Sequence, residues 1–324
     1  MIEYKNNREV LEEFDTYVHG HEEAKKAIIN LVNKSKIRYH QRFTSLNRDY
    51  AVIEPSKLLL IGPSGQGKTF LVEIASKIME FPLLKIDACS LSPTSAAGMT
   101  PDKLKDLIEL KAKGMINTSK HYYSTQGIID QMVIFVDEID KLAKPHDSSG
   151  RWSIHTQESF LTLFDAKDEF SGLSFIFAGA FMGIEQQFKT KSLGFVGNEN
   201  SIIDDTDWAE EIVKFGLIPE LVGRLNGVFK LEDLTKKDYK NILVNILLPK
   251  KIDELLYYHC TDFYLNPEQV DLIVNQAFKS GQGVRSLKRE LNKLVAEIEF
   301  YYEDIPNEQL RLEHVKERYH NQSS

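Results

Sequence analysis

The chain has 324 residues, a formal net charge of −8, and apolar residues at 42% of its positions. This length suits a large domain with a smaller companion and allows a sizeable buried core. The acidic balance argues against nucleic acid as a general partner, because a nucleic-acid clamp needs a basic surface.

Two cysteines, Cys89 and Cys260, are far apart in the sequence and form no C-x-x-C pair. We therefore expect two buried thiols, with neither a disulfide framework nor a zinc site. The first residues lack a secretory or transit pattern, and no run of about 18 apolar residues occurs. We expect a cytoplasmic protein without a membrane segment.

The first expected element is an amphipathic helix that follows the glycine turn Val18-His19-Gly20-His21. Apolar residues at positions 24, 27, 28, 31 and 32 fall on one face of a helix with 3.6 residues per turn. The two histidines are expected to be solvated turn residues, because their spacing alone indicates no metal site.

A phosphate-binding loop is expected at Gly62-Pro63-Ser64-Gly65-Gln66-Gly67-Lys68-Thr69, which fits the pattern G-x-x-x-x-G-K-[ST]. An apolar strand at 58–61 precedes it, and a helix from Phe70 follows. The glycines allow backbone N–H groups to surround phosphate oxygens, Lys68 supplies a cation, and Thr69 supplies a hydroxyl for Mg²⁺. A plain glycine turn would need no Lys-Thr pair.

A second strand is expected at 82–88, then a long loop of small residues, then a helix from Pro101. The apolar run at 133–136 ends in Asp137 and Glu138 and predicts a parallel strand that is covered on both faces. Ligands bind at the carboxyl ends of such strands. One carboxylate suits Mg²⁺ and the other suits the attacking water, although an isolated acidic pair would as readily cap a helix or meet Lys141.

Another strand, at 173–178, is followed by Gly179 and Ala180 and offers no polar side chain at its end. Leu193-Gly194-Phe195 lies in the loop after it, where these residues form an exposed apolar patch or Phe195 returns to the core. A short helix then ends at Gly223, and Arg224 follows as a solvated cation or as a group that reaches a neighbour's γ-phosphate.

After a fifth strand at 228–231 the chain is mostly helical, with helices expected at 236–258, 267–279 and 284–302. Arg285 falls in the first turn of the last helix, where the helix dipole disfavours a cation unless it meets an anion. The expected divisions are 1–55 (N-terminal segment and helix of the large domain), 56–232 (large α/β ATPase domain), 233–235 (hinge), 236–319 (helical small domain) and 320–324 (frayed tail).

Together these motifs resemble the ClpX-like branch of the AAA+ ATPases, from about Tyr17 to Phe300. The specific segments are the Val-His-Gly-His turn, the phosphate loop, the strand that ends in Asp137-Glu138, Gly179-Ala180-Phe181, and the run from Val213 to Leu225. The resemblance implies an α/β fold, the AAA+ P-loop NTPase with a parallel five-stranded sheet flanked by helices, plus a C-terminal mostly helical small domain. It also implies a ring homo-hexamer with ATP bound between subunits.

The resemblance assigns roles by residue. Lys68 would hold the β- and γ-phosphates, Thr69 and Asp137 the Mg²⁺, and Glu138 would activate water. Arg224 would reach a neighbour's nucleotide, and Arg285 would sense nucleotide in its own subunit. The ATP pocket would be formed by Val18 and His19 around the adenine, together with Gly62, Pro63, Ser64, Gly65, Gln66, Gly67, Lys68, Thr69, Phe70 and Arg285.

Three features depart from the family. The family's cysteine-rich N-terminal zinc domain is not expected here. The central-pore motif aligns with Ser95, Ala96, Ala97 and Gly98, which offer no aromatic residue to grip a polypeptide. The loop before the 173–178 strand is short where the family has a basic insertion. By contrast, Leu193-Gly194-Phe195 is similar to the tripeptide with which ClpX docks on its peptidase, and therefore predicts a ClpP-like partner.

The leading hypothesis is an Mg²⁺-dependent ATPase that remodels protein substrates as a hexamer. An alternative is a nucleotide-gated scaffold that switches a complex without threading polypeptide, which the missing pore aromatics favour and Leu193-Gly194-Phe195 disfavours. A DNA-acting motor is a third alternative, which the acidic balance and the lack of a DNA-binding motif oppose.

Overall fold

The computed structural model describes residues 6–43, 53–91, 100–116, 124–143, 151–184, 205–258 and 263–301. The chain divides into two compact units by its internal contacts. The first consists of residues 1–63 and 68–231, and the second of residues 64–67 and 232–324. The first unit holds a β-sheet, and the second holds the C-terminal helices.

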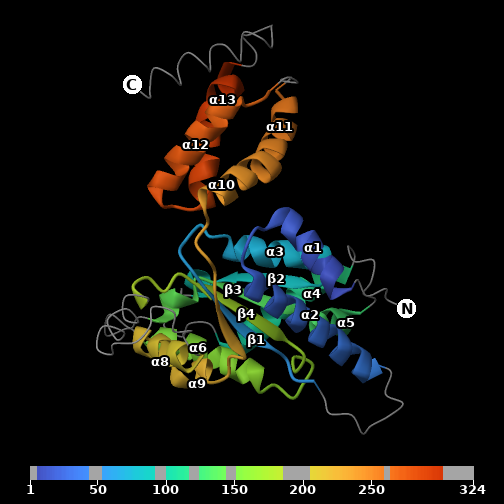
Figure 1. Ribbon diagram of the computed structural model, residues 1–324. Helices are drawn as coiled ribbons and strands as arrows, with labels where there is room; N and C mark the ends of the chain where they lie inside the picture. The colour runs from blue at the N-terminus through green and yellow to red at the C-terminus, as the bar shows by residue number, and fades with distance from the viewer. Residues whose placement is uncertain are drawn as a thin grey trace. The chain divides into compact units, whose positions relative to one another are not determined.

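The first unit is built on a five-stranded sheet in the order β2-β3-β4-β1-β5, in which all neighbouring strands are parallel (Figure 1). This confirms the predicted fold class. The strands are β1 (Lys57–Ile61), β2 (Leu83–Asp87), β3 (Val133–Asp137), β4 (Ser174–Gly179) and β5 (Gly227–Lys230).

Helices cover both faces of the sheet, because alternate side chains of each strand point to opposite sides. Leu58 and Leu60 pack in one core cluster, while Leu59 and Ile61 pack in the other. The first cluster is covered by α1 (Asn7–Tyr17), α2 (Glu22–Phe43) and α3 (Lys68–Met79). The second is covered by α4 (Pro101–Ile116), α5 (Thr125–Gln131), α6 (Arg151–Phe164), α8 (Asp205–Phe215) and α9 (Pro219–Val222).

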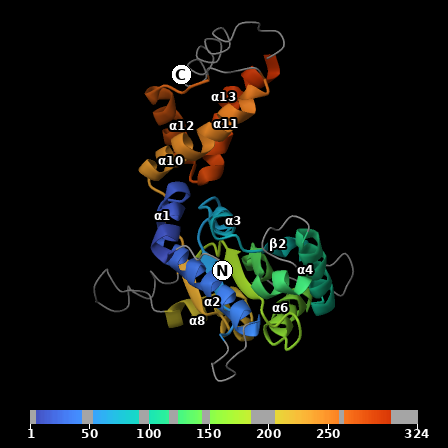
Figure 2. The ribbon, with the colours of Figure 1, turned by 90° about the vertical axis from the view of Figure 1, so that its right-hand side faces the viewer.

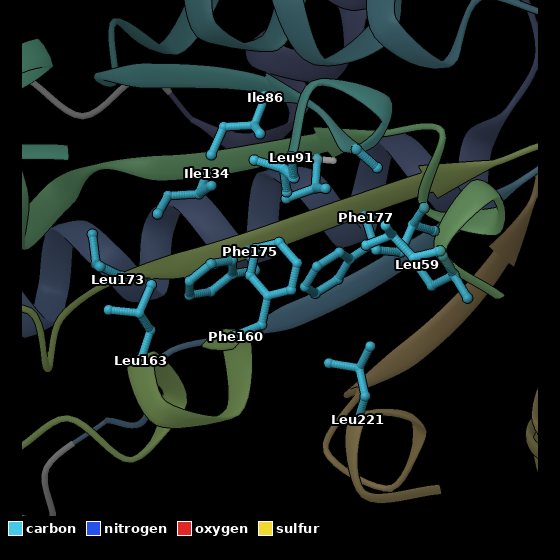
Figure 3. Close-up of a cluster of buried hydrophobic side chains, with 14 of the residues drawn as sticks. Leu59, Ile86, Leu91, Ile134, Phe160, Leu163, Leu173, Phe175, Phe177 and Leu221 are labelled. Carbon is cyan, nitrogen blue, oxygen red and sulfur yellow. The ribbon is translucent and has the colours of Figure 1, made fainter. Parts of the chain in front are cut away.

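Aromatic side chains fill the space between β4 and α6 (Figure 3). The Phe160 ring lies edge-on to Phe177, with 5.4 Å between centroids, and Phe175 stacks on Phe177 at 5.8 Å. Aromatic pairs in these geometries add stability beyond the area that they bury. This cluster fixes α6 against the middle of the sheet.

Three α-helices of the first unit, α1, α5 and α8, were not expected from the sequence. Helix α1 begins at a capping box formed by Asn6 and Glu9, and it buries only Val10 and Phe14. Two buried apolar side chains in eleven residues give little periodicity. Helix α5 is only seven residues long, and α8 lies between the loop and the short helix that were expected after the fourth strand. The two short 3₁₀ helices are η1 (Ala88–Leu91) and η2 (Ile139–Ala143).

The second unit is helical, as Figure 2 shows. Its elements are α10 (Lys236–Ile242), the π-helical turn η3 (Leu243–Leu247), α11 (Leu248–Leu256), α12 (Pro267–Ser280) and α13 (Val284–Tyr301). The π turn interrupts what was expected as one helix and ends two residues before Pro249, which has no N–H to continue the regular ladder. Within the described ranges, no helix has both the length and the apolar character that crossing a bilayer requires.

Gly216 provides a test of the first unit's packing. Its φ is 122°, and a Cβ at this position would lie 1.6 Å from the carbonyl oxygen of Ala143 in η2. We expect Gly216→Ala to lower the free energy of unfolding by about 1–3 kcal/mol more than Gly183→Ala does. Gly183 is the matched control, because it also has a positive φ, 89°, but a Cβ added there would meet no atom within 4 Å. Equal losses in denaturant titrations of the two variants would contradict the close packing.

Candidate active site

Lys68 begins α3 directly after the phosphate loop, and its side chain is buried. Its Nζ donates hydrogen bonds to the carbonyl oxygens of Gly62, at 2.5 Å, and Pro63, at 3.0 Å. These carbonyls belong to the same loop, so the ammonium group lies at the loop that is expected to surround phosphate. A phosphate oxygen is a stronger partner for this cation than a neutral carbonyl oxygen.

Thr69 and Asp137 meet although they come from distant parts of the sequence. The Thr69 hydroxyl donates a hydrogen bond to Oδ2 of Asp137 at 2.5 Å. The other carboxylate oxygen of Asp137 accepts the backbone N–H of Glu138 at 2.9 Å. Hydroxyl and carboxylate oxygens are the donors that Mg²⁺ prefers in proteins, so this pair fits the ion chemically.

Glu138 follows Asp137 in a left-handed backbone conformation, with a φ of 56°. Such a conformation costs a non-glycine residue about 1–3 kcal/mol and is concentrated at functional sites. It turns the chain from β3 into η2, where Lys141 N donates to the Glu138 carbonyl at 2.9 Å. The two adjacent carboxylates therefore have different neighbours, as their proposed separate roles require.

The neighbour of Glu138 is Cys89, whose Sγ donates to Glu138 Oε2 at 3.4 Å. We expected Cys89 to be buried, and this is wrong, because the residue is exposed at the carboxyl edge just after β2. Partial burial of the thiol, its hydrogen bond to Glu138 and the charge of Asp87 raise the pKa of Cys89 to about 11. The thiol thus stays protonated and remains a donor to Glu138 near neutral pH.

The contact between Cys89 and Glu138 could have been inferred from strand order alone. β2 and β3 are parallel neighbours, and Asp87 pairs with Asp137 in register. The residues just after the two strands therefore lie at the same edge. The sequence does not reveal which strands are adjacent, so it could not predict that Cys89 contacts Glu138.

The residues that end β4 have no polar side chain of their own, as expected, but the carboxylate of Asp140 from another segment lies beside them. Asp140 of η2 is buried, and its Oδ1 accepts the backbone N–H of Ala180 at 3.2 Å. Gly179 leaves the space for this contact, since a Cβ there would lie 2.9 Å from the same oxygen. The segment that follows Asp137 and Glu138 is thereby tied to β4.

In the second unit, Arg285 contacts the phosphate-loop residues that belong to that unit. Its Nη1 donates to the Ser64 hydroxyl at 2.7 Å, and Val284 N donates to the Gly65 carbonyl at 3.0 Å. Gly65 has a φ of 88°, and a Cβ there would lie 2.3 Å from the Gln282 carbonyl oxygen. Within this unit the structure therefore brings Arg285 to Ser64, and its sensing role stays a prediction.

Val18 and His19, the expected adenine residues, begin the turn between α1 and α2. Val18 is buried in the same core cluster as Leu71 and Val72 of α3. His19 Nε2 is buried and has no hydrogen-bond partner among the described residues. Phe70 is half-buried against this cluster.

Arg224 lies at the edge of the sheet opposite to the phosphate loop. It comes three residues before β5, and Asn226 N donates to the carbonyl of Lys57, the first residue of β1, at 2.7 Å. The phosphate loop follows the other end of β1. Arg224 Nη1 forms an ion pair with Asp165, and this hydrogen bond lowers the pKa of the Asp165 carboxyl.

Two sets of expected residues lie outside the described part of the chain. They are the pore-loop residues Ser95, Ala96, Ala97 and Gly98, and the docking tripeptide Leu193, Gly194 and Phe195.

Comparisons with known proteins find a matching family model and similar chains. Residues 58–186 match the family model described as "ATPase family associated with various cellular activities (AAA)". The ATP-dependent Clp protease ATP-binding subunit ClpX of Borrelia duttonii is 29% identical, over 90% of this chain and 73% of that protein. ClpX of Treponema denticola is 28% identical, over 90% and 76% of the two chains. ClpX 2 of Wolinella succinogenes is 26% identical, over 93% and 78%.

The thiol of Cys89 can be tested by alkylation in a Cys260→Ser background, which leaves one cysteine. With a pKa of about 11, Cys89 should react with iodoacetamide at pH 8 roughly two orders of magnitude more slowly than an ordinary thiol. Glu138→Gln removes a charge that raises the pKa, so this control should accelerate alkylation. A rate equal to that of a free cysteine, or one that Glu138→Gln leaves unchanged, would contradict the assigned contact.

Proposed function

We propose, from the premise that this chain is a ClpX-like AAA+ ATPase that hydrolyses ATP, that it uses the hydrolysis to remodel protein substrates as a ring of six subunits. The observation that carries the ATP site is the hydrogen bond between Thr69 and Asp137. It joins the phosphate loop to the acidic end of β3 at the place where an Mg·ATP complex needs oxygen ligands.

The residues of the first unit then divide the chemistry. Lys68 exchanges its loop carbonyls for the β- and γ-phosphate oxygens, while Thr69 and Asp137 hold Mg²⁺, which neutralises phosphate charge when bound. Glu138 would orient the attacking water and take its proton as the water oxygen bonds to the γ-phosphorus, while the bond from that phosphorus to the bridging oxygen breaks and ADP leaves with the electron pair. The Cys89 thiol, through its hydrogen bond, fixes the Glu138 carboxylate between turnovers.

The remaining nucleotide contacts are proposals of the same kind. The buried and unpartnered Nε2 of His19 suits a polar edge of adenine, and Val18 suits its face. Arg285 senses the nucleotide from its place beside Ser64. The backbone from Gly62 to Thr69, with Phe70 behind it, surrounds the phosphates.

The place of Arg224 supports the proposed ring assembly. The length of β1, roughly 3.3 Å for each of its five residues, separates Arg224 from its own phosphate loop. An arginine at that edge acts on a nucleotide held by another subunit, and heterologous contacts of this kind close into rings. Among the described residues, the half-exposed guanidinium of Arg224 forms one ion pair, with the surface carboxylate of Asp165. Such a pair is weak, so the guanidinium can leave Asp165 for a phosphate at little cost.

Complementation tests the shared site. Glu138→Gln alone should lower the turnover number at least about 100-fold, and Arg224→Ala alone should do the same. In an equal mixture, Arg224→Ala subunits still offer Glu138 and Glu138→Gln subunits still offer Arg224, so about a quarter of the interfaces regain both groups. Phosphate release from the mixture should therefore exceed that of either variant. An inactive mixture of subunits that assemble would contradict the shared site.

The use of the hydrolysis is tested with a tagged fluorescent protein. A remodeller that threads polypeptide should abolish the fluorescence of this substrate with ATP but not with ADP. Glu138→Gln is the matched control, because it is expected to bind ATP without hydrolysing it. A ClpP-like peptidase, added with the parent chain or with Phe195→Ala, tests the proposed docking tripeptide. Full ATPase activity without any loss of fluorescence would instead favour the scaffold function, which the sequence of the pore-loop segment also allows.

A further inference from the structure

A buried glutamine of α6 links two segments of the first unit that the proposed mechanism uses separately. The side chain of Gln157 belongs to a residue that is only 1% exposed. Its Nε2 donates to the carbonyl oxygen of Leu142 at 3.0 Å, and its Oε1 accepts the backbone N–H of Ile218 at 2.9 Å. The single amide therefore bridges η2 and the residue before α9.

On one side of this bridge is the segment that carries the candidate catalytic carboxylates. Leu142 lies four residues after Glu138, in the same 3₁₀ turn as Asp140. This turn is held by the bond from Lys141 N to the Glu138 carbonyl and by the bond from Ala180 N to Asp140. The Leu142 carbonyl therefore belongs to the turn that directly follows Glu138.

On the other side is the turn that presents Arg224. Ile218 is the N-cap of α9, and no side chain of its own caps this helix. Gly223 N donates to the Pro219 carbonyl at 2.8 Å, and Arg224 N donates to Leu221 at 3.2 Å. Helix α6 contacts both α9 and η2, and it lies beside α9 in Figure 1. One helical turn thus separates the anchored Ile218 from Arg224.

Only an amide of this length can make both bonds. Glutamine supplies a donor and an acceptor at once. A glutamate carboxylate supplies only acceptors, and methionine has no donor and only a weakly accepting sulfur. Since the site is buried, water cannot replace a lost partner, and the unpaired carbonyl and N–H would each be left unsatisfied.

We propose that Gln157 is a positioning residue that places Arg224 for the neighbouring subunit's nucleotide, with the catalytic segment of its own subunit as the reference point. This inference rests on the proposed role of Arg224 in a neighbour's site. It predicts that Gln157 matters in the subunit that donates the arginine, even when that subunit hydrolyses nothing itself.

The experiment places Gln157→Met in one of the two partners of the complementing mixture. The donor partner is Glu138→Gln, which supplies Arg224, and the acceptor partner is Arg224→Ala, which supplies Glu138. Added to the donor, Gln157→Met should lower the regained ATPase about tenfold or more, because a small misplacement of a catalytic group is costly. Added to the acceptor, it should leave the activity within about twofold, since that subunit's arginine is already absent and the Ser153 hydroxyl still donates to the Leu142 carbonyl beside its Glu138 segment.

Ser153→Ala is the matched control, because the Ser153 hydroxyl also donates to the Leu142 carbonyl but does not bond Ile218. It should leave the activity unchanged in either partner. Activity in the acceptor placement also shows that the Gln157→Met chain folds. If that chain is unstable by thermal unfolding, Gln157→Leu, which is also apolar and makes neither bond, is placed in the same way, with the same asymmetry expected.

Equal losses in both placements would overturn the proposal, because Gln157 would then support the subunit's own site or its fold. Unchanged activity in both placements would overturn it as well. Failure of the parent mixture, without any Gln157 change, would instead count against the shared site of the proposed function.

Discussion

The hydrogen bond between Thr69 and Asp137 is the contact on which the candidate site depends. β4 lies between β1 and β3, so the two side chains meet across about two strand spacings, roughly 9.6 Å. This is feasible because each projects from the carboxyl edge, one from the first turn of α3 and the other from the last residue of β3. Small residues at the end of β4 leave room for this approach and for the buried carboxylate of Asp140.

Because its strands are parallel, the sheet has two different edges, and the proposed nucleotide-binding residues and Arg224 lie at opposite ones. Parallel strands gather the nucleotide groups at the carboxyl edge, while Arg224 lies at the amino edge, beside the start of β1. In the proposed ring, each subunit would carry two different halves of a site on opposite edges of its sheet. Each half would be completed by another copy, so assembly and hydrolysis would depend on each other. Gln157 connects the two halves within one chain.

Much of this arrangement could be predicted from the sequence, since strongly patterned segments specify their own structure. The continuous apolar run before Asp137 indicated a doubly covered parallel strand, and the glycine spacing from Gly62 indicated the loop. The missed features depend on tertiary contacts. Helix α1 buries too few residues to show periodicity, and Cys89 meets Glu138 only because β2 adjoins β3. Gln157 looked like any polar helical residue, because its partners are distant backbone groups.

The two polar contacts near Arg224 differ greatly in what breaking them costs. The ion pair with Asp165 joins side chains that are 42% and 59% exposed, and pairs of this kind contribute about 0–1 kcal/mol. The bonds of Gln157 are buried, and each partner left unsatisfied there costs about 1–3 kcal/mol. The backbone that carries the arginine is therefore firmly held, while its side chain can exchange partners at little cost. The proposed transfer of Arg224 from Asp165 to a neighbour's phosphate needs both a fixed backbone and a weakly held side chain. A mobile backbone would misplace the guanidinium, and a buried ion pair would prevent it from leaving Asp165.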